Sequence, residues 1–315
     1  MDLYPYICRD YHKCFFCGSS NVVRNGLRGR KQLYKCKACG RQFVGGRRLD
    51  KNQIITDYIE GKQTIAQLER KYGVSHSTIC RALKGMRYVQ KISKDKHVVI
   101  QLDTTYWGRG FGLMVIKDAM RPKILWRKYV THETIADYLE GVQWLRDNGF
   151  KIYGVVCDGI MGLIKSLSIR YPVQMCQFHL VMIVRRYLTQ DPDLDAAKDL
   201  LRIVNNIVQM DKESFIGAFN DWYAQYKDVL NERTTDRRYK TPPYMRPRLR
   251  SAYLSVKRYM PWLWTWYNYT DRYIPNTNNG VEGVFSDLKS KARVHSGMRK
   301  EQRKKLLDEY MSRHY

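Results

Sequence analysis

Apolar residues are distributed differently along successive stretches of the chain. Residues 1–48 are rich in Cys, Gly, Arg and Lys and show little periodicity, whereas residues 50–88 carry short apolar runs with helical spacing. From His97 onward the apolar runs become strand-like, and residues 180–275 return to helical periodicity. This pattern predicts a small polar module, a group of short helices, an α/β domain and a helical region.

The α/β stretch predicts the order β-β-β-α-β-α-β. Its expected elements are strands over 97–103, 112–120 and 124–130, a helix over 133–146, a strand over 152–157, a helix over 163–169 and a strand over 173–178. The first three strands predict an antiparallel meander, and the later strands arrive through helices, as parallel strands must. A mixed five-stranded sheet is therefore expected, followed by a last helix that begins at Asn279.

The excess of basic residues predicts a polyanionic partner. The 315 residues include 56 Lys and Arg against 30 Asp and Glu, for a net charge of +26. Nucleic acid is the first candidate for such a basic protein; an anionic membrane surface is the competitor, but the sequence shows no basic amphipathic helix. It also shows no secretory signal and no apolar run of about 18 residues. We therefore expect a cytoplasmic protein bound to DNA, with its cysteines reduced.

Two cysteine pairs predict a zinc site in residues 1–48. Cys14-x2-Cys17 is followed after 18 residues by Cys36-x2-Cys39. Two such turns can present four thiolates to one ion, which is the ligand set of a closed, structural Zn²⁺ site. The alternatives are four unrelated reduced thiols, or a site in which Cys8 or His12 replaces one ligand.

Residues 64–83 fit a helix-turn-helix. Thr64 and Gln67 resemble a capping box, Gly73 lies in the turn, and Ser75 can cap the second helix. The alternative is a helical linker without a DNA-binding role. The expected DNA contacts are Ser75, His76, Ser77 and Arg81 in the major groove, and Arg28, Arg30 and Lys31 of the cysteine-rich module on phosphates.

Two acids end predicted strands of the α/β stretch. Asp103 ends the first strand and Asp158 follows the fourth, so neighbouring strands would bring both carboxylates to one edge of the sheet. Two carboxylates at that distance repel each other, and divalent metal removes the conflict. Two Mg²⁺ or Mn²⁺ ions roughly 3.5–4 Å apart can activate an attacking oxygen and stabilise a leaving oxygen in phosphodiester displacement.

A third carboxylate is then expected, and Glu282 is the best candidate. It lies at the start of a helix, after Asn278-Asn279-Gly280-Val281, and Lys289 follows two turns later, where its cation can reach a phosphate. Taken singly, each acid also fits a structural role as a turn residue or a helix-terminal acid. Asp118 and Glu133 are set aside, the first because it lies inside a strand and the second because it fits a first-turn helix acid.

These residues resemble the DDE transposases of bacterial insertion sequences, and in particular the Mutator-type group. The likeness rests on the strand order with its two Asp, on Cys176-x2-His179 after the fifth strand, on the large helical stretch before Glu282, and on the Asn-rich approach to that residue. The N-terminal zinc ribbon departs from the usual Mutator-type front end and is more typical of other insertion-sequence transposases.

The resemblance implies a ribonuclease H-like α/β catalytic domain. It would be built from residues 93–179 and 276–315, interrupted by an all-helical insertion over 180–275, and preceded by a zinc ribbon over 1–48 and a helix-turn-helix domain over 49–92. The implied catalytic residues are Asp103, Asp158, Glu282, Lys289 and His179. Cys176 and His179 remain open between a metal site, a buried pair, and a contact to phosphate or the attacking water.

The implied activity is metal-dependent cleavage at the terminal repeats of an insertion sequence, followed by transfer of the freed 3′-hydroxyl to target DNA. Two DNA ends have to be joined, so a homodimer on DNA is expected. The alternatives are a catalytically inactive DNA-binding regulator derived from a transposase, and a structure-specific nuclease on the same fold.

Overall fold

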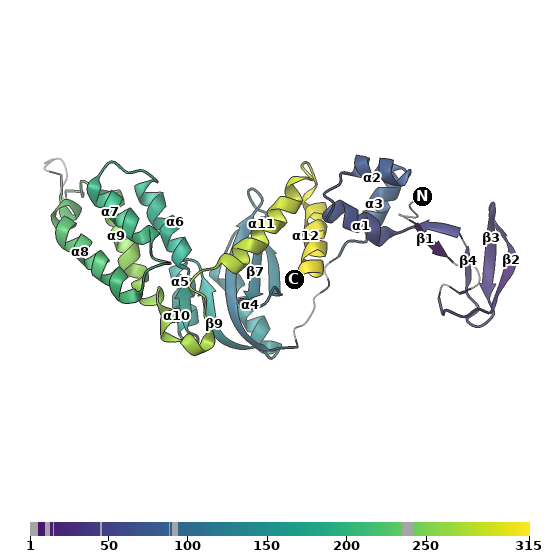
Figure 1. Cartoon of the computed structure of the whole chain (residues 1–315), viewed down its shortest axis with the longest axis horizontal. Helices are drawn as coiled ribbons and strands as arrows, with labels where there is room; N and C mark the ends of the chain where they lie inside the picture. The colour runs from purple at the N-terminus through teal and green to yellow at the C-terminus, as the bar shows by residue number, and fades with distance from the viewer. Residues whose placement is uncertain are drawn as a thin grey trace. The chain divides into compact units, whose positions relative to one another are not determined.

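The structure is a computed structural model that describes residues 6–9, 13–14, 16–44, 46–87, 89, 94–234 and 242–315. The chain forms two compact units (Figure 1). One comprises Met1–Val89 with Leu288–Ser312, and the other comprises Gln90–Asp287 with Arg313–Tyr315.

The second unit contains a five-stranded sheet in the order β10-β9-β6-β7-β8. Its strands are β6 (His97–Tyr106), β7 (Gly112–Asp118), β8 (Ile124–Val130), β9 (Lys151–Cys157) and β10 (Val173–Met175). The pairs β6–β7 and β7–β8 are antiparallel, and the pairs β6–β9 and β9–β10 are parallel. This mixed sheet, with an antiparallel meander followed by two parallel strands, confirms the ribonuclease H-like α/β fold.

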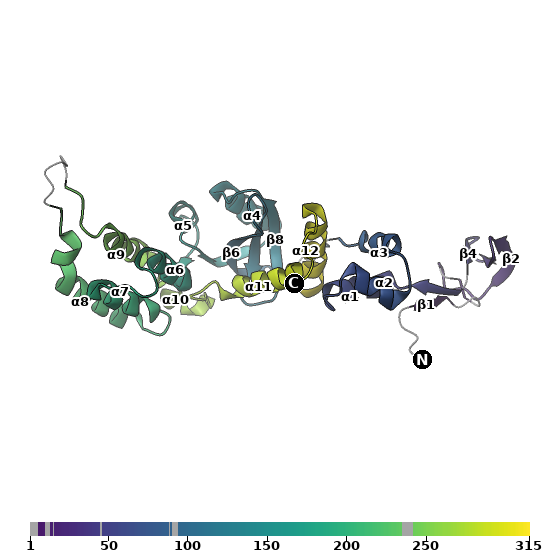
Figure 2. The same ribbon diagram turned by 90° about the horizontal axis from the view of Figure 1, so that it is seen from above.

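Helices α4 (Ile135–Asp147) and α5 (Met161–Ser168) cover one face of this sheet, as Figure 2 shows. Tyr138, Val142 and Leu145 of α4 are buried in one core with Ile100 and Leu102 of β6. The opposite face of β6 carries Val99, Gln101 and Asp103, because successive side chains of a strand alternate. The start of α11 (Asn279–Arg293) lies against that face.

Helices dominate the chain between the sheet and α11. They are α6 (Gln177–Leu188), α7 (Asp195–Asn205), α8 (Lys212–Asn231), α9 (Pro247–Tyr259) and α10 (Thr265–Asn268), with 3-10 turns at Met260–Trp262 and Thr270–Arg272. Stacked aromatic rings form much of their core, among them Phe215, Phe219, Trp222, Tyr253 and Trp264. The Gln177 backbone N–H donates to the Asn276 carbonyl at 3.0 Å, so this helical region leaves the sheet and returns to it at one place.

Three predicted strands have different ends in the structure, and one of them, predicted over 112–120, ends at Asp118. The strand predicted over 173–178 ends at Met175, and α6 begins at Gln177, because Leu180, Val184 and Leu188 bury one helical face. An apolar run of that length does not distinguish a strand from a buried helix. Strand β6 continues beyond Asp103 to Tyr106, because β7 pairs with it as far as Gly112.

The first unit combines two small sheets with four helices. A three-stranded sheet has the order β2-β3-β4, and β1 pairs with β5. The elements are β1 (Tyr6–Arg9), β2 (Val22–Arg28), β3 (Lys31–Cys36), β4 (Gln42–Val44), β5 (Gly46–Leu49), α1 (Lys51–Ile59), α2 (Ile65–Tyr72), α3 (His76–Leu83) and α12 (Lys300–His314).

The C-terminal residues pack against this first unit, which differs from the predicted domain limits. The sequence analysis placed 276–315 in one catalytic domain, whereas Leu288–Ser312 group with the first 89 residues. The His295 ring stacks on Tyr58 with centroids 4.0 Å apart, and Lys291 Nζ lies 2.8 Å from Glu60 Oε2. A helical pattern shows which face of a helix is buried but not which element covers it.

Among the helices that the structure describes, none combines the length and the apolarity needed to cross a membrane.

Gly141 allows α4 to lie close to the sheet. Substitution by alanine should therefore have opposite effects on stability at Gly141 and at Gly217. A Cβ at Gly141 would lie 2.6 Å from Ile116 Cδ1 and 2.7 Å from the Trp126 ring, whereas a Cβ at Gly217 of α8 meets nothing within 4 Å. We expect Gly141→Ala to destabilise the second unit by roughly 1–3 kcal/mol through overpacking. Gly217→Ala should stabilise it by roughly 0.5–1 kcal/mol through helix propensity.

Urea unfolding followed by tryptophan fluorescence measures both effects, because all 7 Trp residues lie in the second unit. Equal midpoints for the two variants would contradict the close packing of α4.

Candidate functional site

Two similar turns present the four cysteines of the first unit. The Gly18 N–H donates to the Cys14 carbonyl and the Gly40 N–H donates to the Cys36 carbonyl, both at 2.9 Å. Both glycines adopt positive φ, +71° and +73°, which other residues rarely adopt. Each Cys-x2-Cys pair therefore closes a tight turn, with its two thiols on the inside.

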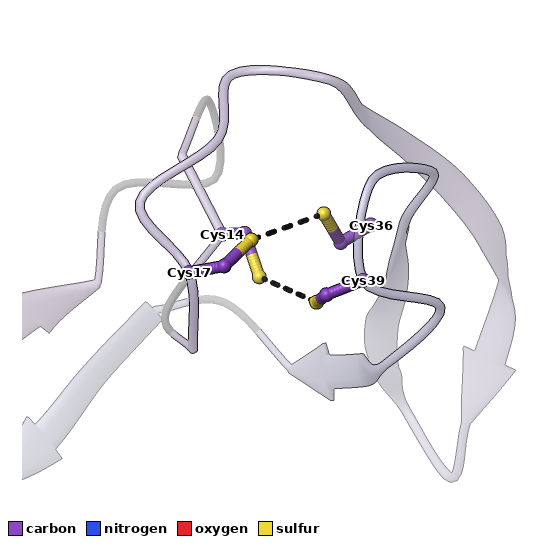
Figure 3. A group of neighbouring side chains, drawn as sticks. All are labelled: Cys14, Cys17, Cys36 and Cys39. Carbon is purple, nitrogen blue, oxygen red and sulfur yellow. Dashed lines mark hydrogen bonds between the residues drawn. The ribbon is translucent and has the colours of Figure 1, made fainter.

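The four sulfurs converge, as Figure 3 shows. Cys14 Sγ lies 3.6 Å from Cys39 Sγ, and Cys17 Sγ lies 3.7 Å from Cys36 Sγ. Sulfurs in a tetrahedral zinc site, each about 2.3 Å from the ion, lie about 3.8 Å apart. All four cysteines are free thiols. The ligand set and its spacing fit Zn²⁺.

The local hydrogen bonds also prepare a thiolate. Burial raises the pKa of Cys14, but the backbone N–H groups of Phe16 and Cys17 outweigh it and lower that pKa to about 6. Of the alternative ligands, His12 and the Cys8 side chain lie outside the described residues.

Zinc removal tests this centre. We expect about one tightly bound zinc per chain, and Cys36→Ser should release it because three thiolates no longer close the tetrahedron. Metal analysis of the purified protein measures the ratio, and Cys80→Ser is the control because Cys80 lies in α3, outside the cluster. A parent protein without zinc, or equal zinc in parent and Cys36→Ser, would refute the assignment.

Asp103 and Asp158 come together because β6 and β9 are parallel neighbours. Gln101 pairs with Val156, so the same register two residues later places Asp103 opposite Asp158. Asp103 is 8% exposed and lies within β6, whereas Asp158 directly follows β9. Adjacent strands are about 4.8 Å apart, so the two carboxylates share one small, poorly hydrated space.

This space carries uncompensated negative charge. Burial raises the pKa of Asp103 well above its ordinary value, and the charges of Asp158, Glu133 and Glu282 raise it further, against one hydrogen bond from the Thr104 N–H. Burial also raises the pKa of Asp158. Asp158 Oδ1 is buried without a hydrogen-bond partner among the described residues. The chemistry of this set fits a hard divalent cation.

The Asn-rich segment fixes the helix that carries Glu282. The Asn278 side chain donates to the Leu102 carbonyl at 2.8 Å, and its backbone N–H donates to Cys176 Sγ at 3.2 Å. A Cβ at Gly280 would lie 2.3 Å from Gln101 Oε1, so the start of α11 lies close to β6. Glu282, in the first turn of α11, is therefore held beside the strand that carries Asp103.

Cys176 and His179 also lie beside Glu282. One ligand atom from each of the three residues lies within 4.8 Å of the others, and His179 Nε2 is 3.9 Å from Glu282 Oε1. Burial lowers the pKa of His179, although the charges of Glu282 and Glu133 oppose this shift. Burial also raises the pKa of Cys176 to about 11. At neutral pH the two side chains are therefore a neutral imidazole and a neutral thiol.

Glu133 joins the same group of acids, although the sequence analysis set it aside as a first-turn helix acid. It lies before the N-cap residue Thr134, outside α4, and its carboxylate accepts a hydrogen bond from the Tyr138 hydroxyl. Asp158 raises its pKa in addition to burial, which places Glu133 within electrostatic reach of the acids. The position of Glu133, one residue before the N-cap residue Thr134, was the sequence signal that its side chain does not belong to the first turn of α4.

The other predicted site residues lie on exposed surfaces. Lys289 is exposed on α11, in the part of that helix grouped with the first unit. Asp118, which was also set aside, is buried and paired with Arg121 at 3.0 Å. The expected DNA contacts are all exposed, Arg28, Arg30 and Lys31 at the β2–β3 turn and Ser75, His76, Ser77 and Arg81 on or just before α3.

The caps of α2 and α3 agree only partly with the sequence analysis. The capping box of Thr64 and Gln67 is present, and Gly73 ends α2 in the left-handed conformation. Ser75 is the N-cap residue of α3 but makes no capping hydrogen bond, because its hydroxyl lies 3.1 Å from those of Ser77 and Thr78 instead.

Comparison with known proteins gives distant structural likenesses. No protein-family model matches the sequence, and no curated protein matches it. The chain is similar to a chain of the Drosophila P element transposase strand transfer complex, with a TM-score of 0.42 and 13% identity over 87% of this chain and 93% of that chain. It is also similar to a chain of the simian T-cell lymphotropic virus intasome in complex with PP2A regulatory subunit B56 gamma, with a TM-score of 0.21 and 13% identity over 50% of this chain and 69% of that chain. The fold assignment rests on the strand order and directions described above.

The raised pKa values predict how pH and metal affect stability. Protonated Asp103, Asp158 and Glu133 stabilise the metal-free protein below the ordinary carboxyl range near pH 4, and this contribution is lost as pH rises through their raised pKa values. Mn²⁺ should therefore raise the Tm of the second unit more at pH 8 than at pH 5. Asp103→Asn should raise the metal-free Tm at pH 8 by roughly 2–4 °C for each ~1 kcal/mol of repulsion removed, and should abolish the Mn²⁺ effect.

Thermal unfolding followed by tryptophan fluorescence measures these shifts. Glu140→Gln is the control, because Glu140 is an exposed residue of α4 that pairs with Lys128. An equal Mn²⁺ effect in Asp103→Asn and the parent would contradict a metal centre at these acids.

Proposed function

We propose that the protein is a DDE transposase of the Mutator type, which binds the ends of an insertion sequence and catalyses metal-dependent DNA cleavage and strand transfer. The observation that carries the proposal is that Asp103 and Asp158 are neighbours at one edge of a ribonuclease H-like sheet, within electrostatic reach of Glu282. An acidic, poorly hydrated edge is unsuited to a DNA phosphate unless cations are also present. Metal-dependent phosphodiester chemistry explains why a basic chain concentrates acids there.

Asp103, Asp158 and Glu282 would hold two Mg²⁺ or Mn²⁺ ions. When bound, such ions activate the attacking oxygen and stabilise the leaving oxygen of a phosphodiester. His179 is neutral and half-buried, and its Nδ1 lacks a partner among the described residues, so it can hydrogen-bond a water or a phosphate oxygen beside Glu282. Lys289 supplies an exposed cation on α11 for a phosphate.

The first unit would select the DNA. In this proposal α2 and α3 form a helix-turn-helix, with Ser75, His76, Ser77 and Arg81 at the major groove. His76 Nδ1 lies 2.9 Å from Glu69, and Arg81 Nε donates to the Ser77 carbonyl, so two of these side chains are already ordered. Around a structural zinc ion, Arg28, Arg30 and Lys31 would contact phosphates of the terminal repeats.

Two basic helices of the helical insertion support a DNA substrate near the acids. Helices α6 and α9 contain no Asp or Glu, and Arg248 donates to the Arg186 carbonyl at 3.2 Å, which places the two helices side by side. The exposed cations of these two helices include Arg186, Arg248, Lys257 and Arg258. Phe178 and Met182 are exposed on α6, four and eight residues before Arg186, and they lie on its side of the helix. Because α6 begins beside the acids, DNA leaving the acidic centre would meet cations here.

Cleavage and strand transfer test the proposal with DNA that carries the regions flanking the coding sequence. We expect Mg²⁺- or Mn²⁺-dependent nicking at the element ends and joining of pre-cleaved ends to a plasmid. Asp103→Asn, Asp158→Asn and Glu282→Gln should each lower both reactions roughly a thousandfold or more while still binding the ends. Glu140→Gln should react like the parent protein.

Two outcomes would favour the alternatives instead. Tight binding of the ends without metal-dependent cleavage by the parent indicates a DNA-binding regulator. Cleavage without joining of pre-cleaved ends indicates a structure-specific nuclease. Because two ends have to be joined, we also propose a homodimer on DNA, which the mass of the protein–DNA complex measures.

A further inference from the structure

Cys176, His179 and Glu282 bring a thiol, an imidazole and a carboxylate to one place in the second unit. One ligand atom of each lies within 4.8 Å of the others, and His179 Nε2 is 3.9 Å from Glu282 Oε1. The nitrogen and oxygen ligands of a tetrahedral Zn²⁺ ion lie roughly 3.3 Å apart. A small rotation of the half-buried Glu282 side chain therefore brings its carboxylate to the spacing of a zinc ligand.

The backbone around Cys176 resembles the two cysteine turns of the first unit. The N–H group four residues later donates to the cysteine carbonyl at Cys176, as it does at Cys14 and Cys36. The N–H groups two and three residues later also lower the pKa of the thiol in all three turns. At Cys176 they do so without a capping hydrogen bond, and burial outweighs them. Cys176-x2-His179 therefore repeats the backbone pattern of a Cys-x2-Cys metal turn, with His179 in the place of the second cysteine.

The ligand types of this group favour a different ion from that of the acidic centre. Thiolate and imidazole favour Zn²⁺, whereas carboxylate oxygens suit Mg²⁺ or Mn²⁺. A zinc ion deprotonates a thiol that it binds, and the proton leaves to solvent. A bound thiolate retains lone pairs, so the Cys176 sulfur can keep the 3.2 Å hydrogen bond from the Asn278 N–H. Three protein ligands leave the fourth position of such an ion open to water.

We propose that Cys176, His179 and Glu282 form a second zinc site, separate from the four-cysteine site, and that zinc bound there inhibits DNA cleavage. Zinc binding at this place does not depend on the proposed function. The inhibition does rest on it, because Glu282 would also hold Mg²⁺ together with Asp103 and Asp158. When the thiol and the imidazole bind zinc, they draw the Glu282 carboxylate onto that ion and away from Mg²⁺.

Co²⁺ binding to the full-length protein tests the site. Co²⁺ occupies zinc sites, and its bond to a thiolate gives a charge-transfer absorption band that oxygen ligands do not give. With the four-cysteine site loaded with zinc, we expect one further equivalent of Co²⁺ to produce this band. Cys176→Ser should lose the band, because serine keeps an acceptor for the Asn278 N–H but offers no thiolate. His179→Gln should need a higher Co²⁺ concentration to reach the same absorbance.

Cys80→Ser is the matched control and should keep the band, because Cys80 lies in α3, outside both ligand groups. Circular dichroism of each variant establishes that it is folded. Cleavage in constant Mg²⁺ is the second readout, and added Zn²⁺ should slow the parent protein in proportion to the occupancy of the site. Cys176→Ser and His179→Gln, each compared with its own rate before Zn²⁺ is added, should be slowed less.

A parent protein without the additional thiolate band, or an equal band in folded Cys176→Ser, would overturn the zinc site. If Zn²⁺ binds at the site but slows the parent and Cys176→Ser equally, or slows neither, competition for Glu282 is refuted. Failure of the proposed function looks different. A parent protein that does not cleave DNA in Mg²⁺ alone refutes that function, while the Co²⁺ band still decides whether Cys176 binds metal.

Discussion

The parallel pairing of β6 and β9 is the constraint on which the acidic centre of the second unit depends. Its register places Asp103 opposite Asp158 at a buried edge of the sheet, where water is too scarce to screen them. Like charges in such a place cost free energy unless protons or cations are present. The apolar residues of β6, buried on both faces, fix this arrangement and leave the two carboxylates no other position. The fold therefore concentrates negative charge at one place on a chain that is otherwise strongly basic.

The third acid, Glu282, is far from Asp103 and Asp158 in the sequence. Hydrogen bonds that involve backbone groups hold its helix beside this edge of the sheet. Asn278 bonds both Leu102 of β6 and Cys176, the N-cap residue of α6 that directly follows β10, so the start of α11 is attached at two places beside the sheet. Gln177 and Asn276 are also hydrogen-bonded, through backbone and side-chain groups. The helical insertion between them begins and ends at one place, and its size does not affect where Glu282 lies. This is why the short Asn-rich segment indicates where Glu282 lies, whereas the helices before it do not.

Sequence patterns predicted those parts of the fold that depend on local periodicity. The five strands, the neighbouring positions of Asp103 and Asp158 and the four-cysteine cluster follow from apolar runs and ligand spacing. The beginning of α6 did not, because residues 173–178 are apolar enough for either a strand or a buried helix. Glu133 was missed because its surroundings, Thr104 and Tyr138, come from different elements. The packing of α12 on the first unit depends on which buried faces match, and a single amphipathic pattern does not contain that information.

Cys176 and His179 both lie beside Glu282 but differ in their contacts. Thiol and imidazole groups favour Zn²⁺, whereas carboxylate oxygens favour Mg²⁺ or Mn²⁺, and Glu282 lies within reach of both sets. Cys176 is fully buried, burial raises its pKa to about 11, and its sulfur accepts the Asn278 N–H, so this neutral thiol attaches the start of α11 to the sheet. His179 faces Glu282 from α6 and lacks such a bond. The two residues are therefore unequal: the thiol positions the helix that carries Glu282, and the imidazole has a ring nitrogen without a hydrogen-bond partner among the described residues.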